Sequence, residues 1–456
     1  MNPRPATDPP ATLKPPATIE VDLDRTLLWS DALHETALGA LRREPLKMSS
    51  LPWLMWRSRE RLRTALRGQP GPDASLLPYN RPLVEWLRTQ RAAGSRIVLR
   101  TAGDLRMARA VADHLKLPDA QVSDAVEGAG DRAPDDGIGR AAPATTGDRA
   151  SGAVDFPRPP PTPADWRRLL RVHQWLKNLL LAVPLLAAHQ VDDPWALGML
   201  LVAFIAFSLC ASAGYVVNDL LDLESDRRHP RKRQRPFAAG VLPVKSGVAL
   251  APALAALGLA VGSLAGPVFM TALVGYLAAS LAYSSWLKRH AVVDCLTLAS
   301  LYTLRVIAGA AAVAIFPSFW LIVFSVFMFL SLAFLKRYAE LQALAATGRR
   351  DTPGRGYAVA DAPLVLTLGI AASQTAVLVL ALYLQGDTVA ALYRTPEIIW
   401  SAVPLLLFWV NWAWLKAHRG EMHDDPVVFA VRDPASRTVA VLLLATFLLA
   451  GTGLGG

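Results

Sequence analysis

Three aspartates with helical spacing are the residues in this sequence best suited to carry chemistry. Asp219, Asp222 and Asp226 lie in the segment N-D-L-L-D-L-E-S-D at positions 218–226, with spacing i, i+3 and i+7. On an α-helix, this spacing puts all three carboxylates on one face. Clustered carboxylates repel one another unless a cation joins them, and Mg²⁺ is typically held by one or two carboxylates together with substrate phosphates. The pattern predicts a Mg²⁺ site for a diphosphate substrate, with an ordinary acidic helix end as the simpler alternative.

Further polar residues lie at the ends of apolar runs or inside them. The candidates for substrate binding are Lys177, Asn218, Tyr283, Lys288, Asp294, Arg305, Lys336 and Arg337. Lysine and arginine can contact an anion directly without a metal. An arginine as deep in an apolar run as Arg305 has to face a polar cavity or a partner. The alternatives are that these cations only set the membrane orientation and that Arg305 makes a structural pair between helices.

A second group of polar residues follows two predicted strands near the start of the chain. Residues 19–26 read I-E-V-D-L-D-R-T and include Asp22 and Asp24, and residues 96–103 read R-I-V-L-R-T-A-G and include Thr101. Apolar residues at 105, 108, 111, 112 and 115 then follow a helical period. The pattern predicts a small α/β domain in which the two strands present these side chains.

Composition separates a polar head from an apolar body. Hydrophobic residues make up 53% of the 456 residues and charged residues only 18%, and the first 165 residues are polar and rich in Pro, Asp and Arg. The two cysteines, Cys210 and Cys295, lie in apolar runs and predict neither a disulfide framework nor a zinc site. Because no secretory signal opens the sequence, we expect the head to remain in the cytoplasm.

The apolar body predicts about nine transmembrane helices, since about 20 apolar residues cross a bilayer. The predicted spans are 170–188, 196–217, 247–264, 267–284, 293–312, 316–335, 364–384, 396–415 and 437–454. The loops after the even-numbered spans hold 18 Lys and Arg residues, whereas those after the odd-numbered spans hold only Arg394. This bias predicts a cytoplasmic N-terminus and active site in the cell membrane. It also accounts for most of the net charge of +10, which leaves nucleic acid a poor candidate partner.

The motif N-D-x-x-D-x-x-x-D after a second span resembles the signature of the UbiA superfamily of intramembrane prenyltransferases. The resemblance runs from about Trp166 to the end. It implies an all-α polytopic membrane bundle with a cavity open to the cytoplasm. It also implies Mg²⁺ bound through Asp219, Asp222 and Asp226.

The remaining motifs resemble one branch of that superfamily. Quinone-pathway members carry a second acidic pair after the sixth span, where this sequence reads F-L-K-R-Y-A-E-L-Q, with Lys336 and Arg337. Together with Q-W-L-K-N, Y-S-x-x-L-K and R-x-I-A-G, this looks like the decaprenyl-phosphate phosphoribosyltransferases. The resemblance implies transfer from 5-phosphoribosyl diphosphate to a polyprenyl phosphate. A prenyltransferase with an aromatic acceptor and a membrane transporter are the alternatives.

The head resembles the haloacid dehalogenase (HAD) phosphatases, although incompletely. The resemblance implies that Asp22 attacks phosphorus, that Asp24 acts as acid and base, and that Thr101 holds the phosphate. The family usually has glycine where Arg25 stands, and its later lysine and metal-binding acidic pair are not visible. We therefore expect a partial HAD-like domain at 1–118, a disordered linker at 119–165 and the membrane transferase domain at 166–456.

Overall fold

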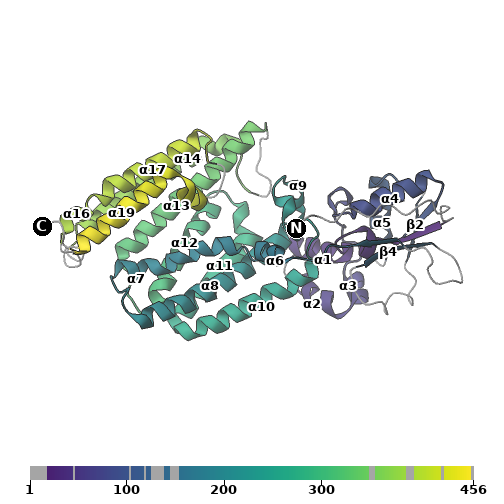
Figure 1. Cartoon of the computed structure of the whole chain (residues 1–456), viewed down its shortest axis with the longest axis horizontal. Helices are drawn as coiled ribbons and strands as arrows, with labels where there is room; N and C mark the ends of the chain where they lie inside the picture. Colours follow the sequence, from purple (N-terminus) through teal and green to yellow (C-terminus); the bar gives the residue numbers. More distant parts are fainter. Residues whose placement is uncertain are drawn as a thin grey trace, which may run out of the picture. The chain divides into compact units, whose positions relative to one another are not determined.

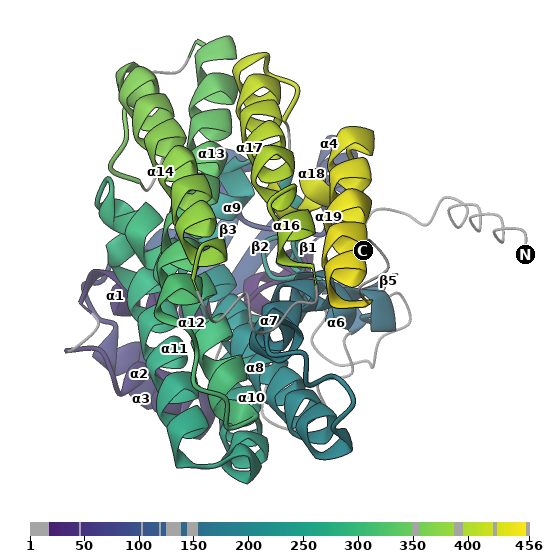
Figure 2. The same cartoon turned by 90° about the vertical axis from the view of Figure 1, so that its left-hand side faces the viewer.

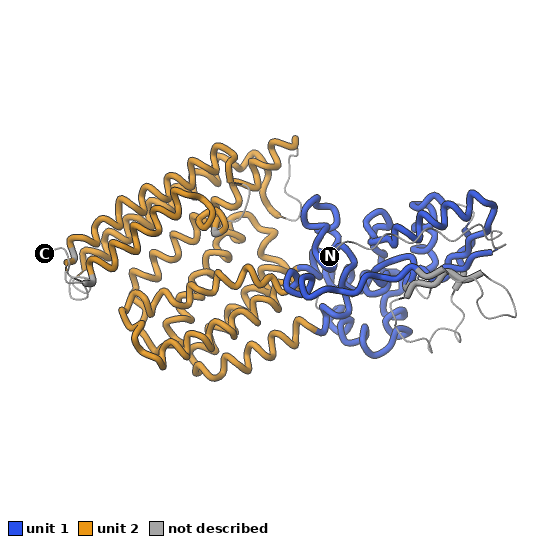
Figure 3. Tube along the Cα trace, viewed as in Figure 1, with its two compact units in different colours: residues 1–169, 219–249 blue, residues 170–218, 250–456 orange. Residues whose placement is uncertain are grey.

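The computed structural model describes residues 18–44, 47–101, 104–117, 120–124, 138–143, 154–348, 355–386, 395–422 and 426–452. The chain forms two compact units, shown in different colours in Figure 3. Unit 1 consists of residues 1–169 and 219–249, and unit 2 consists of residues 170–218 and 250–456. Residues 219–249, predicted to belong with the membrane domain, thus make most of their contacts with the head.

Unit 1 is built around a five-stranded sheet of order β3-β2-β1-β4-β5 (Figure 1). The strands are β1 (Thr18–Asp22), β2 (Arg96–Thr101), β3 (Gln121–Asp124), β4 (Ile138–Pro143) and β5 (Val154–Pro157). β1 pairs with β2, and β2 with β3, in parallel, whereas β4 pairs antiparallel with both β1 and β5. The strands predicted at 19–26 and 96–103 are present over Thr18–Asp22 and Arg96–Thr101, whereas Leu23–Leu27 forms a π-helix instead of continuing the first strand.

The prediction of a disordered linker at 119–165 is wrong for β3, β4 and β5. Each has only four to six residues and no run of alternating apolar side chains. Because a strand with so little intrinsic preference is defined by its neighbours, the conformation is decided by pairing, of β3 with β2, of β4 with β1 and of β5 with β4.

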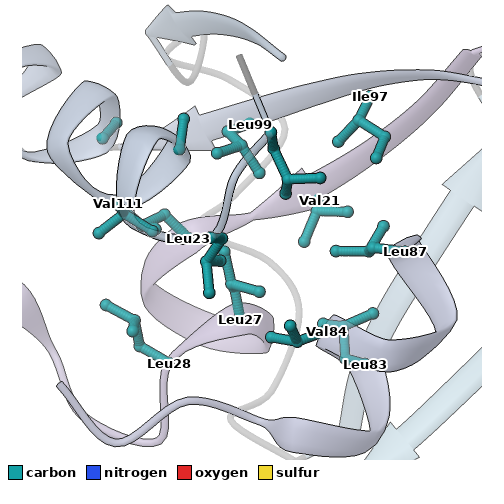
Figure 4. Packing of buried hydrophobic residues seen from close by; sticks show 14 of the residues in the cluster. Val21, Leu23, Leu27, Leu28, Leu83, Val84, Leu87, Ile97, Leu99 and Val111 are labelled. Carbon is teal, nitrogen blue, oxygen red and sulfur yellow. The ribbon is translucent and has the colours of Figure 1, made fainter. Parts of the chain in front are cut away.

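The main apolar core of unit 1 lies between the sheet and the helices α4 (Arg81–Ala92) and α5 (Leu105–His114). The other helices of unit 1 are α1 (Ala32–Arg43), α2 (Leu51–Arg57), α3 (Arg59–Ala65), α6 (Pro163–Leu169) and α9 (Leu223–Arg228). Figure 4 shows Val21 of β1 and Leu99 of β2 packed with Leu87 of α4 and Val111 of α5. The apolar residues of β1 and β2 point into this core. Because the two strands are parallel, they end at the same edge of the sheet, and Asp22 and Thr101 are their last residues.

The described residues of unit 2 form helices joined by turns and loops. Its helices are α7 (Val183–Ala187), α8 (Pro194–Leu221), α10 (Val244–Gly262), α11 (Pro267–Ser285), α12 (Val293–Ala312), α13 (Phe319–Ala346), α14 (Ala362–Leu384), α16 (Pro396–Ile399), α17 (Ala402–His418), α18 (Pro426–Arg432) and α19 (Pro434–Thr452), with the last residues of α8 and the first of α10 belonging to unit 1. α13, α14, α17 and α19 run side by side (Figure 1, Figure 2).

Seven of the nine predicted spans, from 196–217 to 396–415, correspond to described helices long and apolar enough to cross a membrane. These are Pro194–Leu221, Val244–Ala265, Pro267–Ser285, Val293–Ala312, Phe319–Ala346, Val359–Leu384 and Glu397–His418. The ninth predicted span corresponds to a shorter apolar helix, Pro434–Ala450. The chain is therefore a multi-pass membrane protein of the predicted all-α class.

The first predicted span, 170–188, is not one α-helix. Val172–Ala182 forms a 3₁₀-helix that precedes the short helix α7, and Arg171 before it has a left-handed backbone with φ 51°. Pro184, in the first turn of α7, has no N–H, so it cannot continue the hydrogen-bond pattern of the preceding 3₁₀-helix. At about 2.0 Å per residue, the 11 residues of the 3₁₀-helix advance about 22 Å, which is less than the roughly 30 Å thickness of the hydrocarbon core of a bilayer.

We expect Gly309→Ala to destabilise unit 2. A Cβ atom at Gly309 would lie 2.0 Å from the carbonyl oxygen of Leu181, so the 3₁₀-helix has to move away from α12. Overpacking of this kind costs about 1–3 kcal/mol, and a clash with backbone belongs at the upper end. Thermal unfolding in detergent measures it, with Gly275→Ala, which meets no atom within 4 Å, as the control. Equal melting of the two variants would contradict the expectation.

Candidate functional site

The acidic motif lies where one helix ends and another begins. α8 ends at Leu221, Asp222 has the non-helical backbone angles φ −95° and ψ 8°, and α9 starts at Leu223. The predicted single helical face carrying all three carboxylates is therefore interrupted at its middle member. Asp219 and Asp226 are nonetheless both buried, with 3% and 2% of their surface exposed.

Arg235 joins the two buried carboxylates. Its Nη1 atom donates to Oδ1 of Asp219 at 3.0 Å and to Oδ2 of Asp226 at 2.6 Å. Burial raises the pKa of Asp226 to about 6, and the charge of Asp219 adds to this rise while Arg235 opposes it. One nitrogen atom within reach of both carboxylates means that the two acids converge on a single point of positive charge.

This arrangement fits a divalent cation of the Mg²⁺ type. Two convergent carboxylates are what Mg²⁺ uses when substrate phosphates complete its coordination. Among the described residues, no group of three or more His, Cys, Asp or Glu side chains is gathered for a metal. The convergent carboxylates of Asp219 and Asp226 fit Mg²⁺, and the Arg235 guanidinium lies between them, where a cation would bind.

We expect Arg235→Gln to bind a divalent ion more tightly when no donor is present. The guanidinium competes with a metal for the two carboxylates, so its removal leaves their charge for the ion. Mn²⁺ titration followed by electron paramagnetic resonance should give a Kd at least about threefold lower than that of the wild type, or about 0.65 kcal/mol. Arg233→Gln, a nearby loss of the same charge, is the control. A weaker Kd in Arg235→Gln would show that Arg235 supports the site rather than competing for it.

Arg305, predicted to face a cavity or a partner, is buried among protein partners. Its guanidinium donates to Oδ1 of Asn178 at 2.9 Å, to the hydroxyl of Tyr276 at 2.9 Å and to the carbonyl of Leu301 at 2.6 Å. These contacts favour the structural alternative considered for Arg305. Asn178 was missed by the sequence analysis, although it directly follows Lys177 in the Q-W-L-K-N motif.

Three other predicted binding residues, Lys177, Asn218 and Lys288, make two separate contacts in unit 2. The ammonium of Lys288 donates to Oδ1 of Asn218 at 3.2 Å. The ammonium of Lys177 lies 5.5 Å from the centre of the Tyr302 ring, over which Arg305 also lies at 5.4 Å. Cation–π contacts of this kind hold a charged side chain in place in an apolar surrounding.

Asp294 and Arg337, both predicted to bind substrate, bind each other. Nη2 of Arg337 lies 2.8 Å from Oδ2 of Asp294, and neither side chain is exposed. The hydroxyl of Tyr357 donates to Oδ1 of Asp294 at 2.8 Å, and Arg337 also contacts Glu340. A substrate contact would require this pair to separate. Lys336, one residue earlier, is half-buried, as is Tyr283 on α11.

The structure brings the predicted HAD-like residues of the head together. The backbone N–H of Asp24 donates to Oδ1 of Asp22 at 2.8 Å, and the hydroxyl of Thr101 donates to Oδ2 of Asp24 at 3.3 Å. Arg59, which the sequence analysis missed, lies 3.6 Å from Asp24 and also contacts Asp31. Burial raises the pKa of Asp24 to about 6, with the charge of Asp31 adding to the rise and Arg59 opposing it.

The sequence profile of the UbiA prenyltransferase family matches residues 179–433. This range holds the acidic motif, Lys288, Asp294, Arg305, Lys336 and Arg337. It covers more than half of the chain, and it excludes the head.

Two curated proteins are similar to very different shares of this chain. An uncharacterized protein of Sinorhizobium fredii, y4nM, is 35% identical over 94% of this chain and 90% of its own length, so most of the head is shared with it. A decaprenyl-phosphate phosphoribosyltransferase of Mycobacterium tuberculosis is 42% identical over 40% of this chain and 61% of its own length. Among solved structures, a UbiA homolog from Archaeoglobus fulgidus bound to GPP and Mg²⁺ covers 63% of this chain and 99% of its own, at 19% identity and a TM-score of 0.48.

Proposed function

This chain belongs to the UbiA prenyltransferase family, and on that premise we propose that it transfers a 5-phosphoribosyl group from 5-phosphoribosyl diphosphate to a polyprenyl phosphate. As a member of this family it is an intramembrane transferase. The acceptor would be a polyprenyl lipid, the donor a diphosphate, and the cofactor Mg²⁺. Pyrophosphate would be released.

One observation carries the choice of donor, namely the distribution of charge between the two regions where phosphates could bind. Asp219 and Asp226 converge around a cation, which suits a single metal-bound diphosphate. At the end of α13, where prenyltransferases with two acidic motifs carry the second one, the described residues present Lys336, and Arg337 is neutralised by Asp294. The similarity to a phosphoribosyltransferase supports the same choice.

In the proposed reaction, the residues of the chain bind and orient two phosphate-containing substrates. Mg²⁺, when bound, would neutralise charge on the departing pyrophosphate. Asp219, Asp226 and, at the helix break, Asp222 are the proposed ligands, and Arg235 would turn from the carboxylates toward the donor phosphates. Lys177, Lys288 and Lys336 are proposed to orient phosphate groups. Asn218 would position Lys288, whereas Arg305 would order its helix neighbours.

The bond changes require no covalent enzyme intermediate. As the bond from the anomeric carbon to pyrophosphate breaks, positive charge develops on that carbon. A phosphate oxygen of the polyprenyl phosphate attacks from the opposite face and forms the new carbon–oxygen bond. The protein's contribution is to hold the attacking oxygen and the leaving group in line and to stabilise the negative charge on the departing pyrophosphate.

We propose that the acidic motif faces the cytoplasm, on the evidence of 18 Lys and Arg residues against one in alternate loops. Reporter fusions after residues 242 and 390 should then report opposite sides of the membrane. Signals from the same side would refute this orientation.

The donor is tested by supplying two pairs of substrates side by side. Membranes containing the protein receive radiolabelled 5-phosphoribosyl diphosphate with a polyprenyl phosphate, or a prenyl diphosphate with 4-hydroxybenzoate, each with and without Mg²⁺. We expect Mg²⁺-dependent product only from the first pair, and Lys336→Glu should lower donor use although it adds an acid to α13. Product only from the second pair would refute the phosphoribosyl assignment and leave the family assignment intact. Product from neither pair would refute the phosphoribosyl assignment as well and would call for another donor and acceptor.

A further inference from the structure

A buried ion pair within unit 1 joins the head to the acidic motif. Arg227 directly follows Asp226, and its guanidinium donates through Nη1 and Nη2 to the two carboxylate oxygens of Glu35, both at 2.7 Å. Glu35 belongs to α1 of the head, 192 residues earlier in the sequence. The two side chains are only 5% and 3% exposed. This bidentate geometry fixes both the position and the orientation of the Arg227 guanidinium relative to the Glu35 carboxylate.

α9 depends on such a contact because it is too short to hold its own orientation. It has six residues, and the break at Asp222 separates it from α8. A helix of this length has few internal hydrogen bonds and gains its stability from packing. Arg227 holds α9 through two contacts, since besides the ion pair with Glu35 its Nε donates to the carbonyl of Ala238 at 3.1 Å. The residue that follows a proposed metal ligand is therefore tied both to the head and to the loop after α9.

The loop beyond Arg235 is in close contact with the head as well. Gly240 has φ 72°, a left-handed conformation, and a Cβ atom there would lie 2.9 Å from side-chain atoms of both Trp29 and Pro78. Arg158 donates to the carbonyl of Gly240. At the start of α10, the ammonium of Lys245 lies 4.4 Å from the centre of the Trp56 ring. The head thus contacts the segment on both sides of the Arg235 bridge.

We propose that the N-terminal domain positions the acidic motif, with Glu35 holding α9 through Arg227 so that Asp226 stays beside Asp219. The proposal rests on the proposed function for its metal role. It makes Glu35 and Arg227 positioning residues, since neither touches the metal ligands' carboxylates in the contacts described above. It also assigns the head a role that requires no phosphatase chemistry from Asp22, Asp24 and Thr101.

The test separates positioning from stability with three variants of the full-length protein. Arg227→Gln leaves Glu35 as a buried unpaired charge and should destabilise the chain, whereas the double variant Glu35→Gln/Arg227→Gln removes both charges and should recover much of that stability. Arg228→Gln is the matched control, because the neighbouring arginine loses the same charge but pairs with Asp73 and Glu224 at a site where its side chain is 60% exposed.

Two readouts are taken on each variant, namely the Kd for Mn²⁺ by electron paramagnetic resonance and the amide hydrogen exchange of residues 223–235. We expect the double variant to bind Mn²⁺ about 10-fold more weakly than the wild type even where its stability recovers, which is the lower end of the effect of losing support around metal ligands. Exchange of residues 223–235 should rise in both Arg227→Gln and the double variant. Arg228→Gln should match the wild type in both readouts.

The proposal is overturned if the double variant keeps the wild-type Kd and exchange, or if Arg228→Gln weakens Mn²⁺ binding equally. Failure of the proposed function looks different. If the wild type binds Mn²⁺ but makes no phosphoribosyl lipid, the positioning result stands. If the wild type binds no Mn²⁺, the metal role of the acidic motif fails, and the exchange of residues 223–235 alone decides whether Glu35 holds α9.

Discussion

Asp226→Asn is expected to lower transferase activity at least about 100-fold and to weaken Mn²⁺ binding in parallel. The side chain is buried, converges with Asp219 on one cation and, as an amide, loses the charge that a metal ligand needs. Loss of support around metal ligands alone costs 10- to 100-fold, so loss of a ligand itself belongs at the top of this range or above it. A 100-fold loss corresponds to about 2.7 kcal/mol of transition-state stabilisation.

Glu224→Gln is the matched control for Asp226→Asn. Glu224 lies two residues earlier on the same short helix, but its side chain is 51% exposed and pairs with Arg228 at the surface. Exposed pairs contribute about 0–1 kcal/mol, so activity should change less than fivefold. Initial rates in detergent micelles and the Mn²⁺ titration should be measured on the same preparations. Retention of wild-type Mn²⁺ affinity in Asp226→Asn would remove this residue from the metal site.

Arg337→Met should destabilise the chain by about 3 kcal/mol, because Asp294, which has no exposed surface, loses its nearest positive charge. The hydroxyl of Tyr357 still donates to Asp294, and the guanidinium of Arg355 lies 3.9 Å from it, but neither replaces the Arg337 guanidinium at 2.8 Å. The effect should lower the apparent Tm by roughly 10 °C in detergent. The double variant Arg337→Met/Asp294→Asn removes both charges and should recover a large part of the lost stability.

Lys336→Met provides the comparison for Arg337→Met on stability alone. It removes the same charge one residue earlier, from a side chain that is half-buried rather than fully buried. We expect its Tm to fall by less than a third of the drop in Arg337→Met. If Arg337→Met melts like the wild type while its KM for the donor rises strongly, the pair has to open in solution, and Arg337 contacts substrate as the sequence motif first indicated.

The sequence alone predicted the elements whose signals are local. Seven spans could be located because about 20 consecutive apolar residues are a property of one segment. The strands at Asp22 and Thr101 could be located because β1 and β2 are buried and alternate. That Asp24 and Thr101 act together was implied only by the resemblance to the HAD phosphatases, and in the structure the Thr101 hydroxyl donates to Asp24 at 3.3 Å.

Some local predictions failed where the backbone departs from regular geometry. The three aspartates were predicted on one helical face, but the helix breaks at Asp222. The first span was predicted as an α-helix, but Val172–Ala182 is a 3₁₀-helix lying against Gly309 of α12. In both cases the hydrophobic pattern alone does not distinguish a regular helix from an interrupted one, because neighbouring helices decide the local conformation.

By itself, the sequence determined that this is a membrane protein with a polar head, and which acids and cations could act on phosphates. Only the tertiary structure decided which of those charges neutralise each other. Arg235 lies between Asp219 and Asp226, Arg337 pairs with Asp294, and Arg227 pairs with Glu35 of the head. The physical reason is that a buried charge needs a partner, whereas the chain supplies several candidates of each sign. Which candidates meet depends on how distant segments pack, a property that no single segment encodes.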